Sequence, residues 1–115
     1  SAYHKFYAGG NGSGNKMFQI DAVDGLSAYR TITTAGTTGN QTINKIAGTV
    51  NIAAAGTTVT VTNSMVDASS IVLAVVRTND ATAVIKNVVP GSGSFVINTT
   101  AAVTAETSIG FMVLN

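Results

Sequence analysis

The fold is indicated first by the stretch TVTVT at Thr58–Thr62, in which polar and apolar residues alternate strictly. Successive side chains of a β-strand point to opposite faces, so this stretch would bury its valines and expose its threonines. A second alternating stretch, residues 49–53, precedes it across the turn AAGT at residues 54–57. We therefore expect these two stretches to form an antiparallel hairpin with one face in water.

Four further stretches are rich in Val, Ile and Thr, whose branching at Cβ suits a pleated surface. They are residues 71–78, 82–89, 94–99 and 108–114. The first two flank Asn79-Asp80-Ala81 and should form a second hairpin, and Pro90 should end the strand because proline cannot continue a central ladder. Short strands with regular turn signals predict an all-β fold, an antiparallel β-sandwich that is jelly-roll-like.

Two of these strands, residues 71–76 and 109–114, are apolar on both faces. A strand of this kind is central in its sheet, or it lies between the core and a neighbouring subunit. Between the strands, Asn63 and Ser64 offer a cap for a single helical turn that would run through Asp67.

The first part of the chain differs in character, since it holds all three tyrosines and most glycine-rich linkers. Asp24-Gly25 separates two alternating runs and predicts a two-residue hairpin turn, in which Val23 would face Leu26. A ribbon of two strands needs a partner to be stable. We divide the chain into a neck with a β-hairpin, residues 1–46, and a sandwich domain, residues 47–115. Because the chain begins without a leader, we interpret it as part of a longer protein.

The chain carries little charge for its length, with six basic and five acidic residues among 115 and 45% hydrophobic residues. A globular chain of this size averages about 29 charged residues. We expect Thr, Ser, Asn and Gly to supply most of the polar surface, and copies of the chain to bury part of the rest. The basic residues are scattered and no apolar run reaches the roughly 18 residues of a membrane span, so we expect no nucleic-acid binding and no membrane insertion.

Few side chains are suited to catalysis. His4 is the single histidine and there is no cysteine, so one chain can form neither a triad nor a thiolate metal site. The glycine-rich stretch at residues 9–16 lacks the Ser or Thr that a phosphate loop places after its lysine. No two acidic residues are spaced like the carboxylate pair of a glycosidase. They are Asp21, Asp24, Asp67, Asp80 and Glu106. We predict no catalytic residue, no metal site and no cofactor.

The candidate sugar-binding residues are Arg77, Asn79, Asp80 and Tyr29. The first three form the densest polar cluster of the sandwich domain, and at one hairpin tip they could hydrogen-bond sugar hydroxyls. A turn with a local ion pair is the plainer interpretation. Four aromatic residues could stack on a sugar: Tyr3, Phe6, Tyr7 and Tyr29. Packing within the neck or at a subunit interface is the plainer interpretation of them.

Several stretches carry a resemblance to a known family. They are AGTVNI at 47–52, VTVTNS at 59–64, SIVLAVVRTND at 70–80, VVP at 88–90, GSF at 93–95 and IGFMVLN at 109–115. Together they resemble the C-terminal module of phage tailspikes and tail fibres. The segments HKFY at 4–7 and MFQI at 17–20 are similar to a part of fibre shafts that precedes such tips.

The resemblance implies a homotrimeric tip at the distal end of the virion tail, which stabilises the trimer and attaches to host cell-surface polysaccharide or lipopolysaccharide. In tailspikes the depolymerase chemistry lies in an upstream domain, so no enzymatic activity is expected of this chain. A monomeric carbohydrate-binding module of a polysaccharide-degrading enzyme is the alternative. A small hydrolase is disfavoured by the single histidine and by the lack of a nucleophile elbow.

Overall fold

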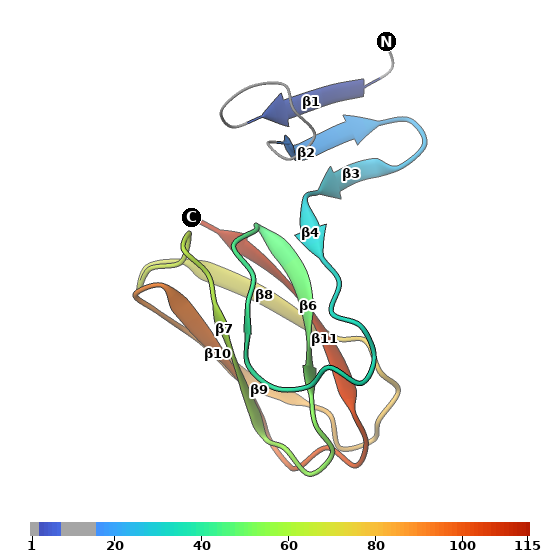
Figure 1. The fold of residues 1–115 in the computed structure, drawn as a ribbon, viewed down its shortest axis with the longest axis vertical. Coiled ribbons are helices and arrows are strands. Elements are labelled where there is room, and N and C mark those ends of the chain that lie inside the picture. Colours follow the sequence, from blue (N-terminus) through green and yellow to red (C-terminus); the bar gives the residue numbers. More distant parts are fainter. Residues whose placement is uncertain (1–2, 8–15) are drawn as a thin grey trace.

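The computed structural model describes residues 3–7 and 16–115, and for residues 3–7 and Lys16 it describes the backbone only. The regular secondary structure of these residues consists of β-strands alone. The strands form one three-stranded and two four-stranded sheets (Figure 1). The strands are β1 (Tyr3–Tyr7), β2 (Lys16–Asp21), β3 (Gly25–Ala28), β4 (Arg30–Thr31), β5 (Gln41–Thr42), β6 (Ala47–Ile52), β7 (Thr58–Thr62), β8 (Ile71–Val76), β9 (Ile85–Gly91), β10 (Ser94–Thr99) and β11 (Thr107–Leu114). The predicted all-β class is confirmed.

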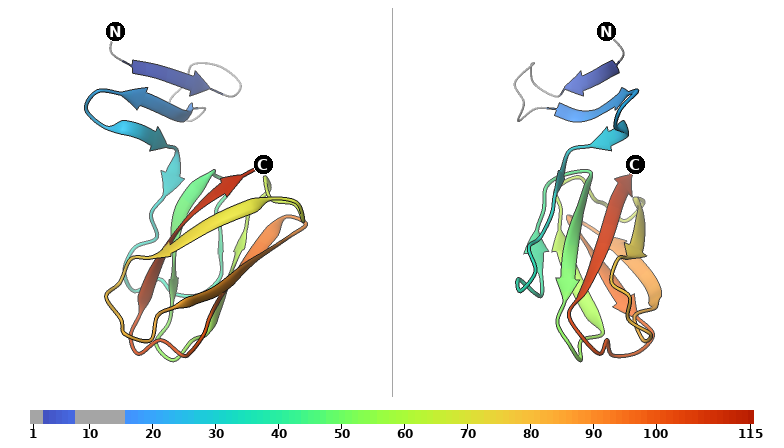
Figure 2. Two further views of the ribbon diagram at one scale, coloured as in Figure 1. Left: turned by 180° about the vertical axis from the view of Figure 1, so that it is seen from behind. Right: turned by 90° about the vertical axis from the view of Figure 1, so that its right-hand side faces the viewer.

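The two four-stranded sheets lie face to face in a sandwich-like arrangement (Figure 2). Their strand orders are β4-β6-β11-β8 and β5-β7-β10-β9. The pairing is antiparallel except at two edges, where the short strands β4 and β5 run parallel to β6 and β7. Both of these strands, and the core residue Ile43, come from the part of the chain before residue 47.

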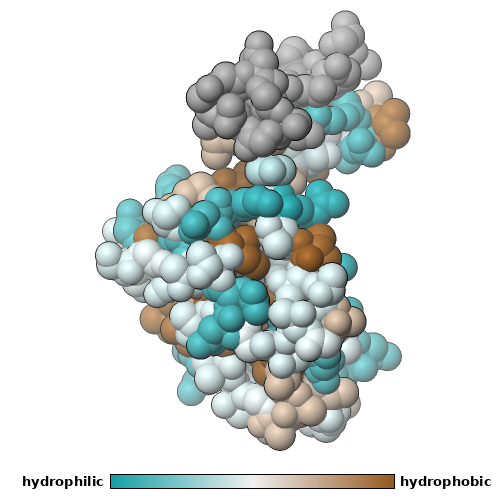
Figure 3. Space-filling model, viewed as in Figure 1, coloured by the Kyte–Doolittle hydropathy of each residue, from teal (hydrophilic) through white to brown (hydrophobic). Residues whose placement is uncertain are grey.

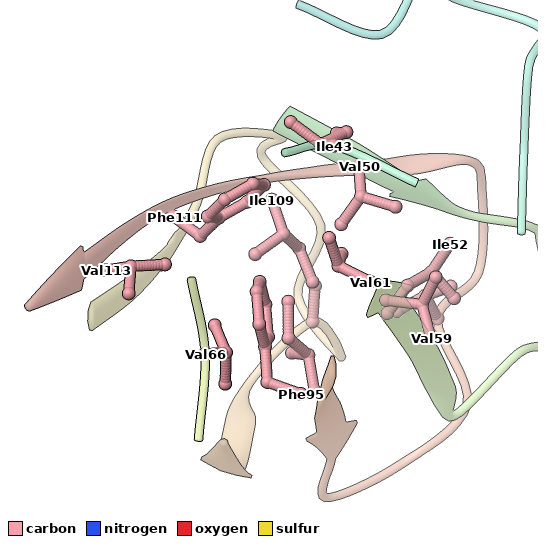
Figure 4. Close-up of a cluster of buried hydrophobic side chains, with 13 residues drawn as sticks. Ile43, Val50, Ile52, Val59, Val61, Val66, Phe95, Ile109, Phe111 and Val113 are labelled. Carbon is pink, nitrogen blue, oxygen red and sulfur yellow. The ribbon is translucent and has the colours of Figure 1, made fainter. Parts of the chain in front are cut away.

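The core between the two sheets is made by the alternating apolar residues that point inward (Figure 4). The ring centroids of Phe95 and Phe111, one from each sheet, are 5.0 Å apart with the planes at 63°, an edge-to-face contact. The central side chains, each at most 5% exposed, are Val50, Ile52, Ile109 and Phe111 from one sheet and Val59, Val61, Phe95 and Ile97 from the other. The alternation predicted for β7 is confirmed.

The two predicted hairpins of the sandwich are not formed. β6 pairs with β4 and β11 whereas β7 pairs with β5 and β10, so residues 53–57 cross from one sheet to the other. β8 and β9 also belong to different sheets. An alternating strand can bury its apolar side whether the next strand pairs with it in the same sheet or lies across the core in the other sheet. The sequence pattern is the same in both cases.

β8 is an edge strand, so of the two interpretations offered for residues 71–76 the central position is wrong, whereas β11, which contains residues 109–114, is central in its sheet. β9 is also an edge strand and continues through Pro90 to Gly91, beyond the predicted end. Proline is tolerated there because an edge strand needs hydrogen bonds on one side only. The predicted helical turn after Asn63 is absent as well, and Asn63 Oδ1 instead accepts a bond from the backbone N–H of Met65 in a tight turn.

The β2–β3 hairpin is present, but its predicted register is wrong. Ile20 faces Leu26 and Asp21 faces Gly25, so the loop has three residues, 22–24, in place of two. Gly25 adopts a φ of 66°, and the Asp21 carboxylate accepts bonds from the backbone N–H groups of Val23 and Asp24. This is the turn geometry of a three-residue loop that closes with a left-handed glycine.

Candidate functional site

The outer faces of the two sandwich sheets differ in polarity. The outward residues of β7 and β10 on the β5-β7-β10-β9 sheet are mostly Thr, Ser and Asn. On the other sheet β8 presents Ile71, Leu73 and Val75, which are 62%, 52% and 62% exposed. In the view of Figure 3 the sandwich is mostly white and teal with small separate brown groups, as expected for a surface built from weakly polar residues.

We call the apolar outer surface of the β4-β6-β11-β8 sheet the β8 face, made by Ile71, Leu73 and Val75 of β8 with Met112 and Leu114 of β11. Strand pairing sets these side chains next to one another, since Met112 lies opposite Leu73 and Leu114 lies opposite Ile71. The β8 face is therefore a continuous apolar strip at the edge of the sheet. An apolar edge strand of this length is one that proteins normally cover.

A shallow groove of about 380 Å³ runs along the β8 face. Its floor is low at Gly110, which has no side chain and lies between Thr49 and Val75 on the neighbouring strands. A Cβ on Gly110 would lie 3.3 Å from Cδ of Arg77, so the aliphatic stem of that arginine reaches over the glycine. The groove therefore continues from the apolar strip to a charged side chain.

Arg77 follows directly after β8 and is fixed to the start of β11. Its backbone N–H donates to the carbonyl oxygen of Ser108 at 2.8 Å, and its Nη1 donates to Oγ of the same serine at 3.1 Å. The side chain is exposed otherwise. Arg77 is thus a candidate from the sequence that the structure leaves accessible for binding, at the edge of this sheet.

Asp80 joins the loop that follows β8 to the loop that precedes β11. These loops lie at the end of the sandwich opposite to the β1-β2-β3 sheet (Figure 1). The Asp80 carboxylate accepts bonds from the hydroxyl and backbone N–H of Thr82, from the hydroxyl and N–H of Thr104, and from the N–H of Ala105. These bonds, chiefly the one from the Thr104 hydroxyl, hold the pKa of Asp80 well below its ordinary value. Asp80 is thus engaged in a structural role, with Arg77 bonded elsewhere and Asn79 exposed between them.

Tyr29 lies apart from this cluster, at the junction between β3 and β4. Its ring is covered by Lys45, whose Nζ lies 4.4 Å from the ring centroid. The next residue, Arg30, pairs with Ala47, which is opposite Met112 near the far end of β11 from Arg77. The structure therefore does not bring the four candidates into one site. The side chains of His4, Tyr3, Phe6 and Tyr7 lie outside the described residues.

A second hollow, of about 400 Å³, lies beside Arg77. We call it the polar hollow, and its lining residues are Thr33, Ala35, Asn51, Arg77, Thr78, Glu106 and Ser108. Sequence reasoning named Arg77 but missed Asn51, Glu106 and Ser108 as members of one site. Asn51 comes from β6, Glu106 from the loop before β11, and Ser108 from β11. The sequence indicates only that Asn51 and Ser108 face outward on alternating strands.

Asn51 and Glu106 are held in fixed positions in the polar hollow. Asn51 is 2% exposed, and its Nδ2 donates to the carbonyl oxygens of Thr34 and Thr37 and to Oε2 of Glu106. The Glu106 carboxylate also accepts the backbone N–H of Gly36, at 2.8 Å to Oε2. Asn51 Oδ1 is buried and accepts no hydrogen bond from the part of the chain that the structure describes.

Comparisons with protein-family models, with curated proteins and with solved structures found no match to this chain. Across residues 3–7 and 16–115, no cluster of three or more His, Cys, Asp or Glu side chains is arranged to hold a metal ion. Within the same residues, no helix has the length and apolar character needed to cross a membrane.

Proposed function

We propose that this chain is the trimer-forming C-terminal tip of a phage tailspike or tail fibre, and that it attaches the virion tail to host cell-surface polysaccharide or lipopolysaccharide. In this proposal the sandwich is jelly-roll-like and three copies pack around one axis. The role is attachment and trimer stabilisation, without bond cleavage.

The observation that carries the proposal is the β8 face. A chain with only 10% charged residues still leaves Ile71, Leu73 and Val75 more than half exposed on one edge strand. Monomeric proteins rarely expose a contiguous apolar strip of this kind unless a partner covers it. Another copy of the chain is a suitable occupant because its own β8 face is equally apolar, and Arg30 and Arg77, which line the groove beside the strip, would lie at the polar rim of such a contact.

The stoichiometry in this proposal follows from the resemblance to phage tips, and the β8 face is the surface that we assign to the contact between copies. Burial there also explains why residues 71–76 are apolar on both sides although β8 is an edge strand. One side packs on the core and the other would pack on the neighbour.

The arrangement along the long axis agrees with a tip. The N-terminal sheet lies at one end of the molecule, and the loops 53–57, 78–84 and 100–106 gather at the other (Figure 1). Ala55 N–H donates to the carbonyl oxygen of Val103, and Asp80 fastens Thr104, so the three loops form one connected surface. If the chain continues upstream into a shaft, this loop end faces away from it.

The proposal is tested by applying the fluorescently labelled chain to an array of purified bacterial lipopolysaccharides and capsular polysaccharides, beside plant and fungal wall polysaccharides. A tail tip should bind a narrow set of the bacterial glycans as a trimer and release no reducing sugar from them. Binding by a monomer, chiefly to wall polysaccharides, would support the alternative of an enzyme-linked carbohydrate-binding module. Release of sugar would revive the hydrolase.

A further inference from the structure

We propose that the polar hollow is a saccharide-binding subsite, and that it selects a neutral sugar over an acidic one. This inference rests on the proposed function, since it names where on the tip a glycan is held and of what class. It depends on three side chains, Arg77, Glu106 and Asn51, that meet in one hollow.

Two opposite charges line the polar hollow, and neither is paired with the other. Arg77 donates to Ser108 Oγ, and Glu106 accepts from Gly36 and Asn51. Each charged group therefore keeps further hydrogen-bonding capacity, because a guanidinium has five N–H donors and a carboxylate about four acceptor positions. Charged groups held in place by the fold recognise a ligand at little entropic cost.

Asn51, which lines the polar hollow, has a buried acceptor without a partner in the described part of the chain. Flipping the amide would not remove it, because Nδ2 already donates to two carbonyl oxygens and to Glu106, and an oxygen placed there would meet three acceptors. A buried acceptor without a partner is uncommon in native proteins and calls for a ligand or a water that supplies the donor. Oδ1 has almost no accessible surface, so a hydroxyl group in the hollow can become its donor only if the groups around it move, and the direct contribution of Asn51 is the bond from Nδ2 that fixes Glu106.

The two charged side chains determine which class of ligand the polar hollow can hold. A sugar hydroxyl can donate to Glu106 and accept from Arg77 at the same time, and adjacent hydroxyls can use the hydroxyl groups of Thr78 and Ser108. An acidic sugar would be attracted by Arg77 but repelled by Glu106, and an amine would meet the reverse. Neutral vicinal hydroxyls are therefore the group that suits both charged side chains of the polar hollow.

The test is a titration of the 115-residue chain, labelled with nitrogen-15, with millimolar glucose, galactose, mannose and N-acetylglucosamine, and separately with galacturonic acid. We expect at least one neutral sugar to shift the amide signals of Gly36 and Ser108, while Thr60 on the opposite sheet stays unchanged. In Glu106→Gln the affinity for that sugar should fall about fivefold to tenfold, as a charge-assisted bond becomes a neutral one, and galacturonic acid should bind more tightly.

Arg77→Gln supplies a second variant, since this side chain is exposed and its loss leaves the loops in place. It should weaken neutral-sugar binding, whereas the matched controls Arg30→Gln and Asp24→Asn should not. The proposal is overturned if no neutral sugar shifts these amide signals, or if galacturonic acid binds the unmodified chain more tightly than the neutral sugars do. Light scattering on the same samples and the glycan array described above separate this failure from that of the proposed function. A trimer that binds polysaccharide without using the polar hollow would refute only the subsite.

Discussion

Replacing Leu73 by lysine should separate the proposed trimer into folded monomers. Leu73 lies in the middle of the β8 face, 52% exposed in the single chain, with Ile71 and Val75 on either side. In a monomer the lysine would extend its charge into water and rest its methylene stem on the strip. In the assembly the same charge would be enclosed against apolar side chains of a neighbour, which is unfavourable without a partner.

The magnitude follows from how much of the β8 face remains exposed. Complete burial of a Val, Leu or Ile side chain contributes about 1.5–3 kcal/mol relative to full exposure. The three β8 residues are 62%, 52% and 62% exposed, so covering them contributes about 3–5 kcal/mol per copy. Leu73→Lys removes about 1 kcal/mol of this in each copy and adds the cost of an enclosed charge, which together raise the dissociation constant by several powers of ten.

The assay is light scattering after size exclusion, with circular dichroism to verify the fold. Val89→Lys is the matched control, since Val89 is 49% exposed on the edge strand β9 of the other sheet. Leu73→Lys should elute as a monomer with an unchanged spectrum, and Val89→Lys should keep the mass of the unmodified chain. The reasoning is refuted if Leu73→Lys remains assembled, or if Val89→Lys dissociates to the same degree.

Three further substitutions test the fold itself. Phe95→Ala should lower the free energy of unfolding, measured in urea, by about 3–5 kcal/mol, because it leaves a cavity in the core and removes the edge-to-face contact with Phe111. A loss below about 1 kcal/mol would contradict the core described above. Gly48→Ala should cost about 1–3 kcal/mol in the same assay, since its Cβ would lie 2.8 Å from the Thr31 carbonyl oxygen. Asp80→Asn should lower the melting temperature at neutral pH but much less in strong acid. The folded-state pKa of Asp80 lies below its ordinary value of about 3.9, so the contribution of the carboxylate is present above that pH and is lost as the pH falls below it. Equal effects at both pH values would refute this role.

The sequence predicted individual strands well because strict alternation depends on one strand alone. β7 and β10 have the predicted bounds, and the valines of β7 are buried as expected. Which strands pair depends on whether a loop turns back or crosses over the core, and residues 53–57 are compatible with either. The register of the β2–β3 hairpin was also beyond prediction, since it depends on bonds from the loop backbone to the Asp21 carboxylate.

The candidate site was predictable in part, for a related reason. Arg77 could be found from the density of polar residues around it, but Asn51, Glu106 and Ser108 are brought to it by pairing between distant strands. Asp80 was correctly placed in a turn, yet its bonds to Thr104 connect loops that the sequence gives no reason to associate. For β8, an apolar residue facing the core and one facing outward have the same signature in the sequence.

The central claim is that copies of this chain cover the β8 face of one another, and the native mass of the unmodified chain tests it most directly. Light scattering after size exclusion should be run at two protein concentrations that differ widely. The account predicts three times the chain mass of 11.6 kDa at both concentrations. A mass of one chain at both would contradict it, and would mean that Ile71, Leu73 and Val75 face water in the functional protein.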